Sequence, residues 1–226
     1  MKVDIKAREI RQVINADVAN IGTSSEGSQL EERKLRILFL AANPLKTTRL
    51  RLDEEIRSID EAIQKSAFRK NIELNQQWAT RALDLQDHIL RYTPNLVHFS
   101  GHGAASGKLL LENESGLEEQ VSVDFLSRIF TEIGSGIKCI VLNACYSGVQ
   151  ASCIGQHVSC VIGLPGTIKD KKAILFSQAF YSAIGYGKDI QTSFNLACNQ
   201  ISLNDSGPDS IPHLFGRSDP TQIRLL

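Results

Sequence analysis

Short apolar segments alternate with amphipathic segments from Leu35 onward, and this alternation constrains the fold more than any other feature. Five segments of strand length, most of them apolar, occupy residues 35–42, 71–79, 95–100, 137–145 and 159–166. Segments with helical spacing of apolar residues occupy 52–68, 80–92, 123–134, 171–187 and 189–202. Strands that alternate with helices form a mostly parallel sheet with helices on both faces. The sequence therefore predicts an α/β fold.

Local signals add detail to this outline. Leu52, Ile56, Ile59, Ile63 and Phe68 recur at helical spacing and are expected to share one buried helix face. Thr80 is expected to cap the helix at 80–92, with Pro94 just beyond its end. Residues 108–113 and 120–124 resemble a small hairpin, and residues 212–226 are expected to be mostly loop with one terminal strand.

Composition argues against two classes of partner. Lys and Arg total 25 and Asp and Glu also total 25, so the chain lacks the basic excess that neutralises nucleic-acid phosphates. The longest apolar stretches, near Ile137–Ala144 and Val158–Gly166, are shorter than the roughly 20 residues of a membrane-spanning helix. The N-terminus has no hydrophobic signal core. We expect a soluble cytoplasmic protein that binds neither nucleic acid nor membrane.

The first 34 residues differ in composition from the remainder. Residues Gly22–Arg33 are rich in Gly, Ser and Glu and are interpreted as a linker. Residues 10–22 are apolar enough to be a short strand-like assembly segment, although a frayed tail is the alternative. The predicted organisation is an N-terminal segment, residues 1–34, followed by one larger domain, residues 35–226.

The cysteine pattern argues against two structural uses of cysteine. The chain has five cysteines, an odd number, and no pair has C-x-x-C spacing. A disulfide framework and a zinc site are therefore both disfavoured, and we expect no metal. Most of the cysteines are expected to be buried, and four are interpreted as structural residues: Cys139, Cys153, Cys160 and Cys198.

Two strand ends carry reactive side chains flanked by small residues. The strand at 95–100 is followed by "SGHG", which presents His102, and the strand at 137–145 ends in "ACYSG", which presents Cys145. The two residues are 43 positions apart, enough for a hairpin and one crossover helix. A right-handed crossover would place both side chains at the same edge of the sheet.

A cysteine nucleophile needs this kind of neighbour. A free thiol has a pKa of about 8.5, and a nearby imidazole can accept its proton and later protonate the leaving amine. The backbone N–H groups of Gly103 and Cys145 are the expected oxyanion donors. His98 lies within the strand and is interpreted as a packed core residue.

The motifs "VHFSGHG" and "VLNACYSG" resemble those of CHAT domains, which are caspase-like (clan CD) cysteine peptidases. The segments "LRLDEEIRSIDEAI", "ATRALDL" and "VIGLPGTIKDKKAILFSQAFYSAIGYG" resemble the same family, so the resemblance covers about Leu35 to Gly216. It implies a caspase-like three-layer sandwich, endopeptidase activity without a cofactor, and a dyad in which His102 and Cys145 are the catalytic residues.

The substrate pocket departs from a related pattern. Metacaspase-type enzymes have an acidic residue two positions before the cysteine that helps to bind a basic substrate residue, whereas this chain has Asn143. Asp170 is a candidate for the same pocket, or alternatively a cap of the helix that begins near Lys171. Asn143 and Asp170 are therefore both candidate pocket residues.

The family context suggests biological partners. Caspase-like effectors in bacteria are often coupled to sensors in defence or cell-death systems, so the resemblance implies an antiviral or cell-death role. It also suggests a gasdermin-like pore former as substrate, and an upstream sensor or homotypic assembly acting through residues 10–22. The alternative function is a caspase-like scaffold that binds a partner with little proteolysis.

Overall fold

The computed structural model describes residues 34–203 and 211–226. The predicted linker and the assembly segment at residues 10–22 lie outside these described residues, so both remain predictions. The described residues include the domain from Leu35 onward, so its fold can be compared with the caspase-like fold that the resemblance implies.

A six-stranded sheet lies at the centre of the domain, in the order β2-β1-β3-β7-β8-β9. Its strands are β1 (Leu35–Ala41), β2 (Ile72–Gln77), β3 (Leu96–Ser100), β7 (Cys139–Asn143), β8 (Cys160–Gly163) and β9 (His213–Phe215). The first five strands pair in parallel, and β9 adds to the edge in the antiparallel sense. The predicted mostly parallel sheet is confirmed.

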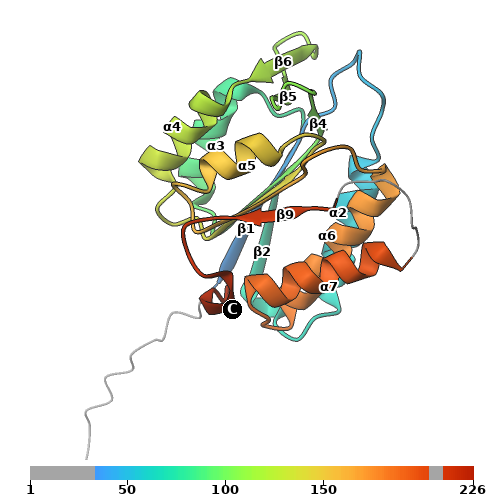
Figure 1. Cartoon of the computed structure of the whole chain (residues 1–226), viewed down its shortest axis with the longest axis vertical. Helices are drawn as coiled ribbons and strands as arrows, with labels where there is room; N and C mark the ends of the chain where they lie inside the picture. Colours follow the sequence, from blue (N-terminus) through green and yellow to red (C-terminus); the bar gives the residue numbers. More distant parts are fainter. Residues whose placement is uncertain (1–33, 204–210) are drawn as a thin grey trace, which may run out of the picture. The chain divides into compact units, whose positions relative to one another are not determined.

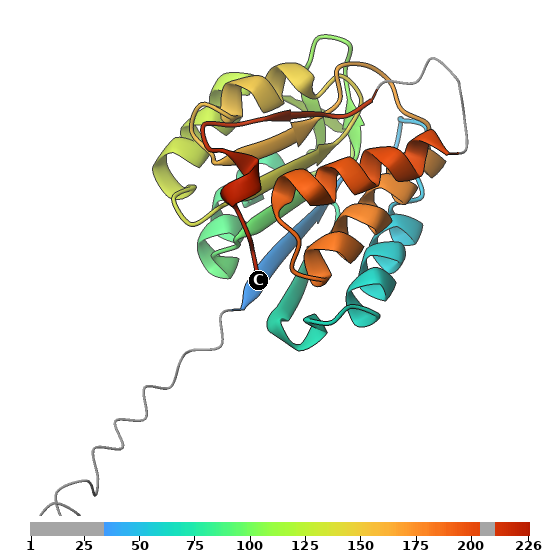
Figure 2. The ribbon, with the colours of Figure 1, turned by 60° about the horizontal axis from the view of Figure 1, so that its bottom comes forward.

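Helices cover both faces of this sheet, as Figures 1 and 2 show. One layer contains α2 (Leu52–Gln64), α6 (Asp170–Gly185) and α7 (Ile190–Ser202). The other contains α3 (Leu85–Tyr92), α4 (Val123–Ile133) and α5 (Gly148–Ile154). The architecture is the three-layer sandwich that the sequence predicts.

The alternation of side chains along β3 divides the core into two. Leu96 belongs to the cluster shared with α2, α6 and α7, whereas Val97 and Phe99 belong to the cluster shared with α3 and α4. Successive side chains of a strand point to opposite faces, so a strand covered on both sides must be apolar throughout. His98 and Ser100 are the polar exceptions, and both are fully buried on the α2 side.

A second, three-stranded sheet lies beyond the end of β3 (Figure 1). Its strands are β4 (His102–Gly103), β5 (Leu109–Glu112) and β6 (Glu118–Val121), all antiparallel. The predicted hairpin corresponds to β5 and β6. Strand β4 was not expected, and it incorporates His102 into a small sheet instead of a free loop.

The predicted helix at 52–68 is too long, and Phe68 does not share its buried face. Helix α2 ends at Gln64, and Phe68 is 43% exposed. The chain turns at Ser66, whose hydroxyl and backbone N–H both donate to the carbonyl of Ile63. The Phe68 N–H then donates to the carbonyl of Gly185 at the end of α6. Contact with α6 therefore ends α2 early and directs the chain into β2.

The prediction that Thr80 caps a helix is wrong. Thr80 is buried, its N–H donates to the carbonyl of Ala41, and its hydroxyl donates to the carbonyl of Gln77. A short 3₁₀ turn at Ala82–Asp84 follows, and α3 starts only at Leu85. The polar groups of Thr80 are used to attach the chain to the ends of β1 and β2.

Ile59 offers a test of the α2 layer. It is fully buried in the cluster between α2 and the sheet, so Ile59→Ala should lower the free energy of unfolding by about 2–5 kcal/mol in a urea titration. Leu90 on α3 is 51% exposed, and the control Leu90→Ala should change it by no more than about 0.5 kcal/mol. Equal effects of the two substitutions would contradict this packing.

Candidate active site

Strands β3 and β7 bring His102 and Cys145 together. The two strands are neighbours, and their last residues, Ser100 and Asn143, are partners in the parallel register. His102 follows Ser100 by two residues and Cys145 follows Asn143 by two residues. Both side chains follow their strand ends by the same number of residues, so they lie at the same edge of the sheet, as the sequence predicts.

Both side chains border one small cavity of about 80 Å³. The cavity is also lined by apolar side chains from the loop before α2, from the loop before α6 and from the start of both helices: Leu50, Leu52, Ile168 and Ala173. Its polar lining includes Glu55, Ser100, Asn143 and Asp170. The cavity thus offers apolar walls beside a thiol and an imidazole.

Glycine at position 103 lets two backbone segments approach closely. A Cβ atom on Gly103 would lie 1.8 Å from the carbonyl oxygen of Cys145. No side chain larger than hydrogen fits at that distance, so only glycine permits the β4 backbone to lie against the backbone of Cys145. The two residues predicted to donate to an oxyanion are therefore neighbours in space.

The turn after β7 holds Cys145 from the opposite side. Tyr146 has a left-handed backbone, with φ of 56°, and its N–H donates to the carbonyl of Gly166. The Ser147 hydroxyl donates to the carbonyl of Leu142 and accepts from the N–H of Leu164. A positive φ at a non-glycine residue costs energy, so these bonds to the β8 loop maintain the strained turn that presents Cys145.

The surroundings of His102 favour its neutral form. Partial burial lowers the pKa of the imidazole below its ordinary value of 6.5, while the Thr48 backbone, Asp170 and Glu118 act in the opposite direction. Within the described residues, Nε2 of His102 is buried without a hydrogen-bond partner. A neutral ring with one nitrogen unoccupied suits a general base. Thr48 was not identified from the sequence, because no motif marks a backbone contact.

Asp170 and Asn143 both border the cavity, as the pocket prediction requires. Asp170 is the first residue of α6, one position after the N-cap residue Lys169, and its carboxylate accepts from Nε of Arg51 at 2.9 Å. The side-chain amide of Asn143 donates to Glu55 at 2.5 Å. The capping alternative for Asp170 is therefore wrong, and Asn143 is already engaged within the protein.

Glu55 is a second residue of the site that the sequence did not identify. It lies on α2, is only 3% exposed, and borders the cavity. Burial opposes its ionisation, but hydrogen bonds from His98, Ser100 and Ser177 outweigh this and hold the pKa of its carboxyl below the ordinary value of 4.5. In the sequence, Glu55 is one acid among several in "LDEEIRSIDE", and only its position on the inner helix face distinguishes it.

Comparison with known proteins shows the family of this chain. The family model for the CHAT domain matches residues 14–209. The chain belongs to the CHAT domain family. Because the match begins at residue 14, inside the segment separated above as residues 1–34, the domain boundary stays a prediction.

Two curated proteins are similar to this CHAT domain. A probable protease from Gillisia limnaea is 23% identical over 181 residues, which are 78% of this chain and 32% of that protein. A Roc-COR-CHAT protease from an unknown prokaryotic organism is 25% identical over 193 residues, which are 82% of this chain and 18% of that protein. The chain thus spans about a third and about a fifth of these relatives.

The fold also has a solved counterpart. The crystal structure of caspase-1 from Spodoptera frugiperda superposes with a TM-score of 0.53 and 13% sequence identity, over 81% of this chain and 86% of that one. At this identity the likeness concerns the fold alone, and it confirms the caspase-like architecture of the CHAT domain.

Burial disfavours the thiolate form of three of the other cysteines. Burial raises the pKa of Cys139 well above its ordinary value and raises those of Cys160 and Cys198 to about 11. These thiols are therefore protonated at neutral pH, which agrees with a structural role. Cys153 lies half-buried on α5 and does not border the cavity.

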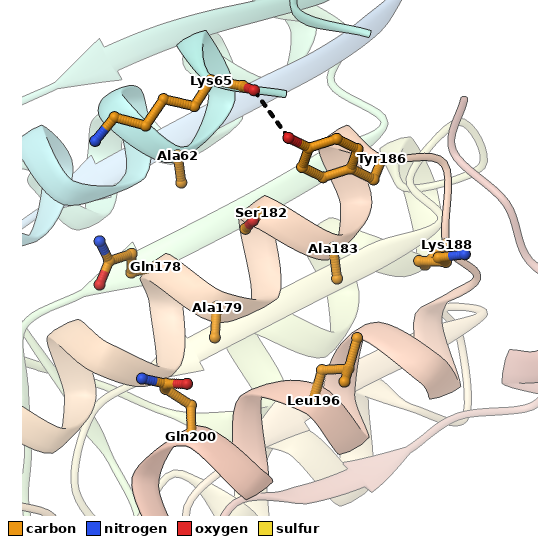
Figure 3. Close-up of a pocket in the computed structure, with 10 residues that line it drawn as sticks. All are labelled: Ala62, Lys65, Gln178, Ala179, Ser182, Ala183, Tyr186, Lys188, Leu196 and Gln200. Atoms are coloured by element: carbon orange, nitrogen blue, oxygen red, sulfur yellow. Dashed lines mark hydrogen bonds between the residues drawn. The ribbon is translucent and has the colours of Figure 1, made fainter. Parts of the chain in front are cut away.

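A larger hollow of about 580 Å³ lies elsewhere, along α6 between α2 and α7 (Figure 3). Its floor is formed by short side chains, among them Ala179, Ser182 and Ala183, and the Tyr186 hydroxyl donates to the carbonyl of Lys65 beside it. Neither member of the predicted dyad borders this hollow, so size alone does not mark the active site.

Two further features of the described residues bear on function class. None of the helices there is long and apolar enough to cross a membrane. The described residues also include no cluster of three or more His, Cys, Asp or Glu side chains arranged to hold a metal ion.

The close approach of Gly103 to Cys145 generates a prediction about thiol reactivity. Gly103→Ala should push the Cys145 backbone away, slow alkylation of Cys145 by iodoacetamide, and cost about 1–3 kcal/mol of stability through overpacking. Mass spectrometry of the labelled peptide measures the rate. A Cβ atom on Gly136 would meet nothing within 4 Å, so Gly136→Ala is the matched control. Identical rates in the two variants would contradict the contact.

Proposed function

We propose that this CHAT domain is a cysteine endopeptidase in which Cys145 is the nucleophile and His102 is the general base and then the general acid. The observation that supports this most is the shared cavity of the two side chains, at the ends of two strands paired in register. The unoccupied Nε2 of His102 supports it further.

The proposed reaction proceeds in two halves. The Cys145 sulfur forms a bond to the scissile carbonyl carbon as its proton passes to His102. His102 then gives a proton to the leaving amine as the C–N bond breaks, which leaves a thioester on Cys145. In the second half, His102 takes a proton from water, the hydroxide attacks the thioester, and the acid product leaves with the thiol restored.

The negative charge that develops on the carbonyl oxygen requires fixed donors. We assign this role to the backbone N–H groups of Gly103 and Cys145. The support is their spatial proximity, which the missing side chain of Gly103 permits. Backbone donors are held by β4 and by the Tyr146 turn, so they need no reorganisation during the reaction.

The cavity beside the dyad is the proposed pocket for the substrate residue before the scissile bond. Asn143 and Asp170 border it, and Leu50, Leu52 and Ile168 supply apolar walls. Because Asp170 is paired with Arg51, its charge is partly compensated. The role of Asp170 in the pocket is therefore to hold Arg51 at the rim as well as to face the substrate.

The biological context is proposed from the family resemblance. We infer a cytoplasmic effector in bacterial defence or regulated cell death, with a protein substrate such as a gasdermin-like pore former. Upstream control would come from a sensor, or from homotypic assembly through residues 10–22. The curated relatives are much longer than the region that aligns with this chain.

The dyad can be tested by substitution. Because Cys145 supplies the bond-forming atom, Cys145→Ala should lower cleavage of a mixed peptide library by about 10⁴-fold or more, while the melting temperature stays close to that of the unaltered protein. Cys153→Ala, which alters a thiol outside the cavity, should leave cleavage unchanged. Products are identified by mass spectrometry. Persistent cleavage by Cys145→Ala would refute the dyad, and a folded protein that cleaves nothing would favour the scaffold alternative.

The pH dependence follows from the lowered pKa of His102. A base whose pKa lies below 6.5 keeps its neutral, proton-accepting form to lower pH than a free imidazole. The acid limb of kcat/KM should therefore have its midpoint below pH 6.5, and activity should be lost as the pH falls through that midpoint. The exposed residue His213 serves as control, and His213→Gln should leave the profile in place. A midpoint at or above 6.5 would contradict this environment.

A further inference from the structure

Glu55 connects α2 to both strands that present the dyad. Its carboxylate accepts hydrogen bonds from Ser100 at the end of β3 and from Asn143 at the end of β7. These two residues are register partners in the sheet, so one buried carboxylate joins neighbouring strand ends from the helical side.

The carboxylate is held in turn from two other directions. The Ser177 hydroxyl on α6 donates to Oε1 of Glu55 at 2.6 Å, and Nε2 of His98 lies 3.1 Å from the same oxygen. Nδ1 of His98 lies 3.1 Å from the hydroxyl of Tyr181. All these bonds are formed at once when the Tyr181 hydroxyl donates to Nδ1 and Nε2 carries the hydrogen. The network then has a single centre, the carboxylate of Glu55.

An ionised carboxylate is suited to this centre. It offers about four acceptor sites and no donor, which matches the four groups that face it. A glutamine would offer one neutral acceptor oxygen, and its N–H₂ group would face Ser100, which would then have to accept instead of donate. Replacing Glu55 by Gln therefore leaves the volume nearly unchanged but removes the negative charge to which the four groups now donate.

The distance from this network to the dyad is a single residue on each strand. Gly101 separates Ser100 from His102, and Ala144 separates Asn143 from Cys145. Gly101 has no spare room, since a Cβ there would lie 2.7 Å from the carbonyl oxygen of Ala42, and Ala144 is buried. Displacement of Ser100 or Asn143 is thus transmitted to the reactive side chains.

We propose that Glu55 is a positioning residue of the active site, which sets the separation of His102 and Cys145 by binding the ends of β3 and β7 together. It acts through Ser100 and Asn143 and contacts neither reacting atom. This inference rests on the proposed cysteine endopeptidase function. It adds to the dyad a third residue, the buried acid Glu55, on which the positions of His102 and Cys145 depend.

The test compares Glu55→Gln with Glu61→Gln, which removes an exposed acid from the same helix. Misplacement of reacting groups by a fraction of an ångström is costly, so Glu55→Gln should lower kcat by about tenfold or more, with little change in KM. Its rate of alkylation at Cys145 should also fall, measured well below the melting temperature. Glu61→Gln should match the unaltered protein in all three quantities.

A structural role alone gives a different result. If Glu55→Gln lowers only the melting temperature, while kcat and the alkylation rate of the folded protein stay unchanged, the positioning role is refuted. If the unaltered protein cleaves no peptide, the proposed function fails by itself, and the alkylation rates of the two variants still decide the role of Glu55.

If the Glu55→Gln variant does not fold, the proposal can be tested by substituting the hydrogen-bond partners of Glu55. Ser100→Ala removes the bond between Glu55 and the end of β3. Ser177→Ala removes the bond between Glu55 and α6 together with a long 3.5 Å contact from Asn143, but it leaves both strand ends bonded to Glu55. Positioning requires slower alkylation of Cys145 in Ser100→Ala than in Ser177→Ala. Equal rates in the two variants would refute it.

Discussion

The parallel pairing of β3 with β7 is the constraint on which the rest of the site depends. Its register sets Ser100 opposite Asn143, so the next residues of both strands leave the sheet side by side. The pairing is maintained by apolar side chains on both faces, which make the two strands the buried centre of a three-layer domain. The proximity of His102 and Cys145, the proposed dyad, is therefore a consequence of sheet register, provided that the loops after both strands are short.

Short loops demand small residues and strong attachments. Gly103 lies against the backbone of Cys145 because it lacks a side chain, and the strained turn at Tyr146 is held by bonds to the loop after β8. Glu55 adds an attachment from the helical layer. A buried charge is costly unless it is fully hydrogen-bonded, so its presence beside the cavity requires the polar residues that surround it, and these occur on β3, β7 and α6.

The boundaries of two helices show where tertiary contacts override local sequence patterns. Helical spacing continues to Phe68, yet α2 ends at Gln64 because Ser66 and Phe68 make hydrogen bonds to Ile63 and Gly185. Thr80 has the residue type of a helix cap, but its backbone N–H is used to bind Ala41 of β1. In both cases the hydrogen-bond partner is remote in sequence or lies outside the helical pattern. The local periodicity of apolar residues therefore cannot predict it.

The sequence by itself determined the order of strands and helices, the mostly parallel sheet and the candidate pair His102 and Cys145, because period and strand-end position are local properties. Only the tertiary structure decided which acid lies beneath the pair. Glu55 and Glu54 are adjacent and chemically identical, yet Glu54 pairs with exposed Arg51 whereas Glu55 is buried among donors. That difference arises from packing α2 against β3 and β7, which brings together residues more than 40 positions apart.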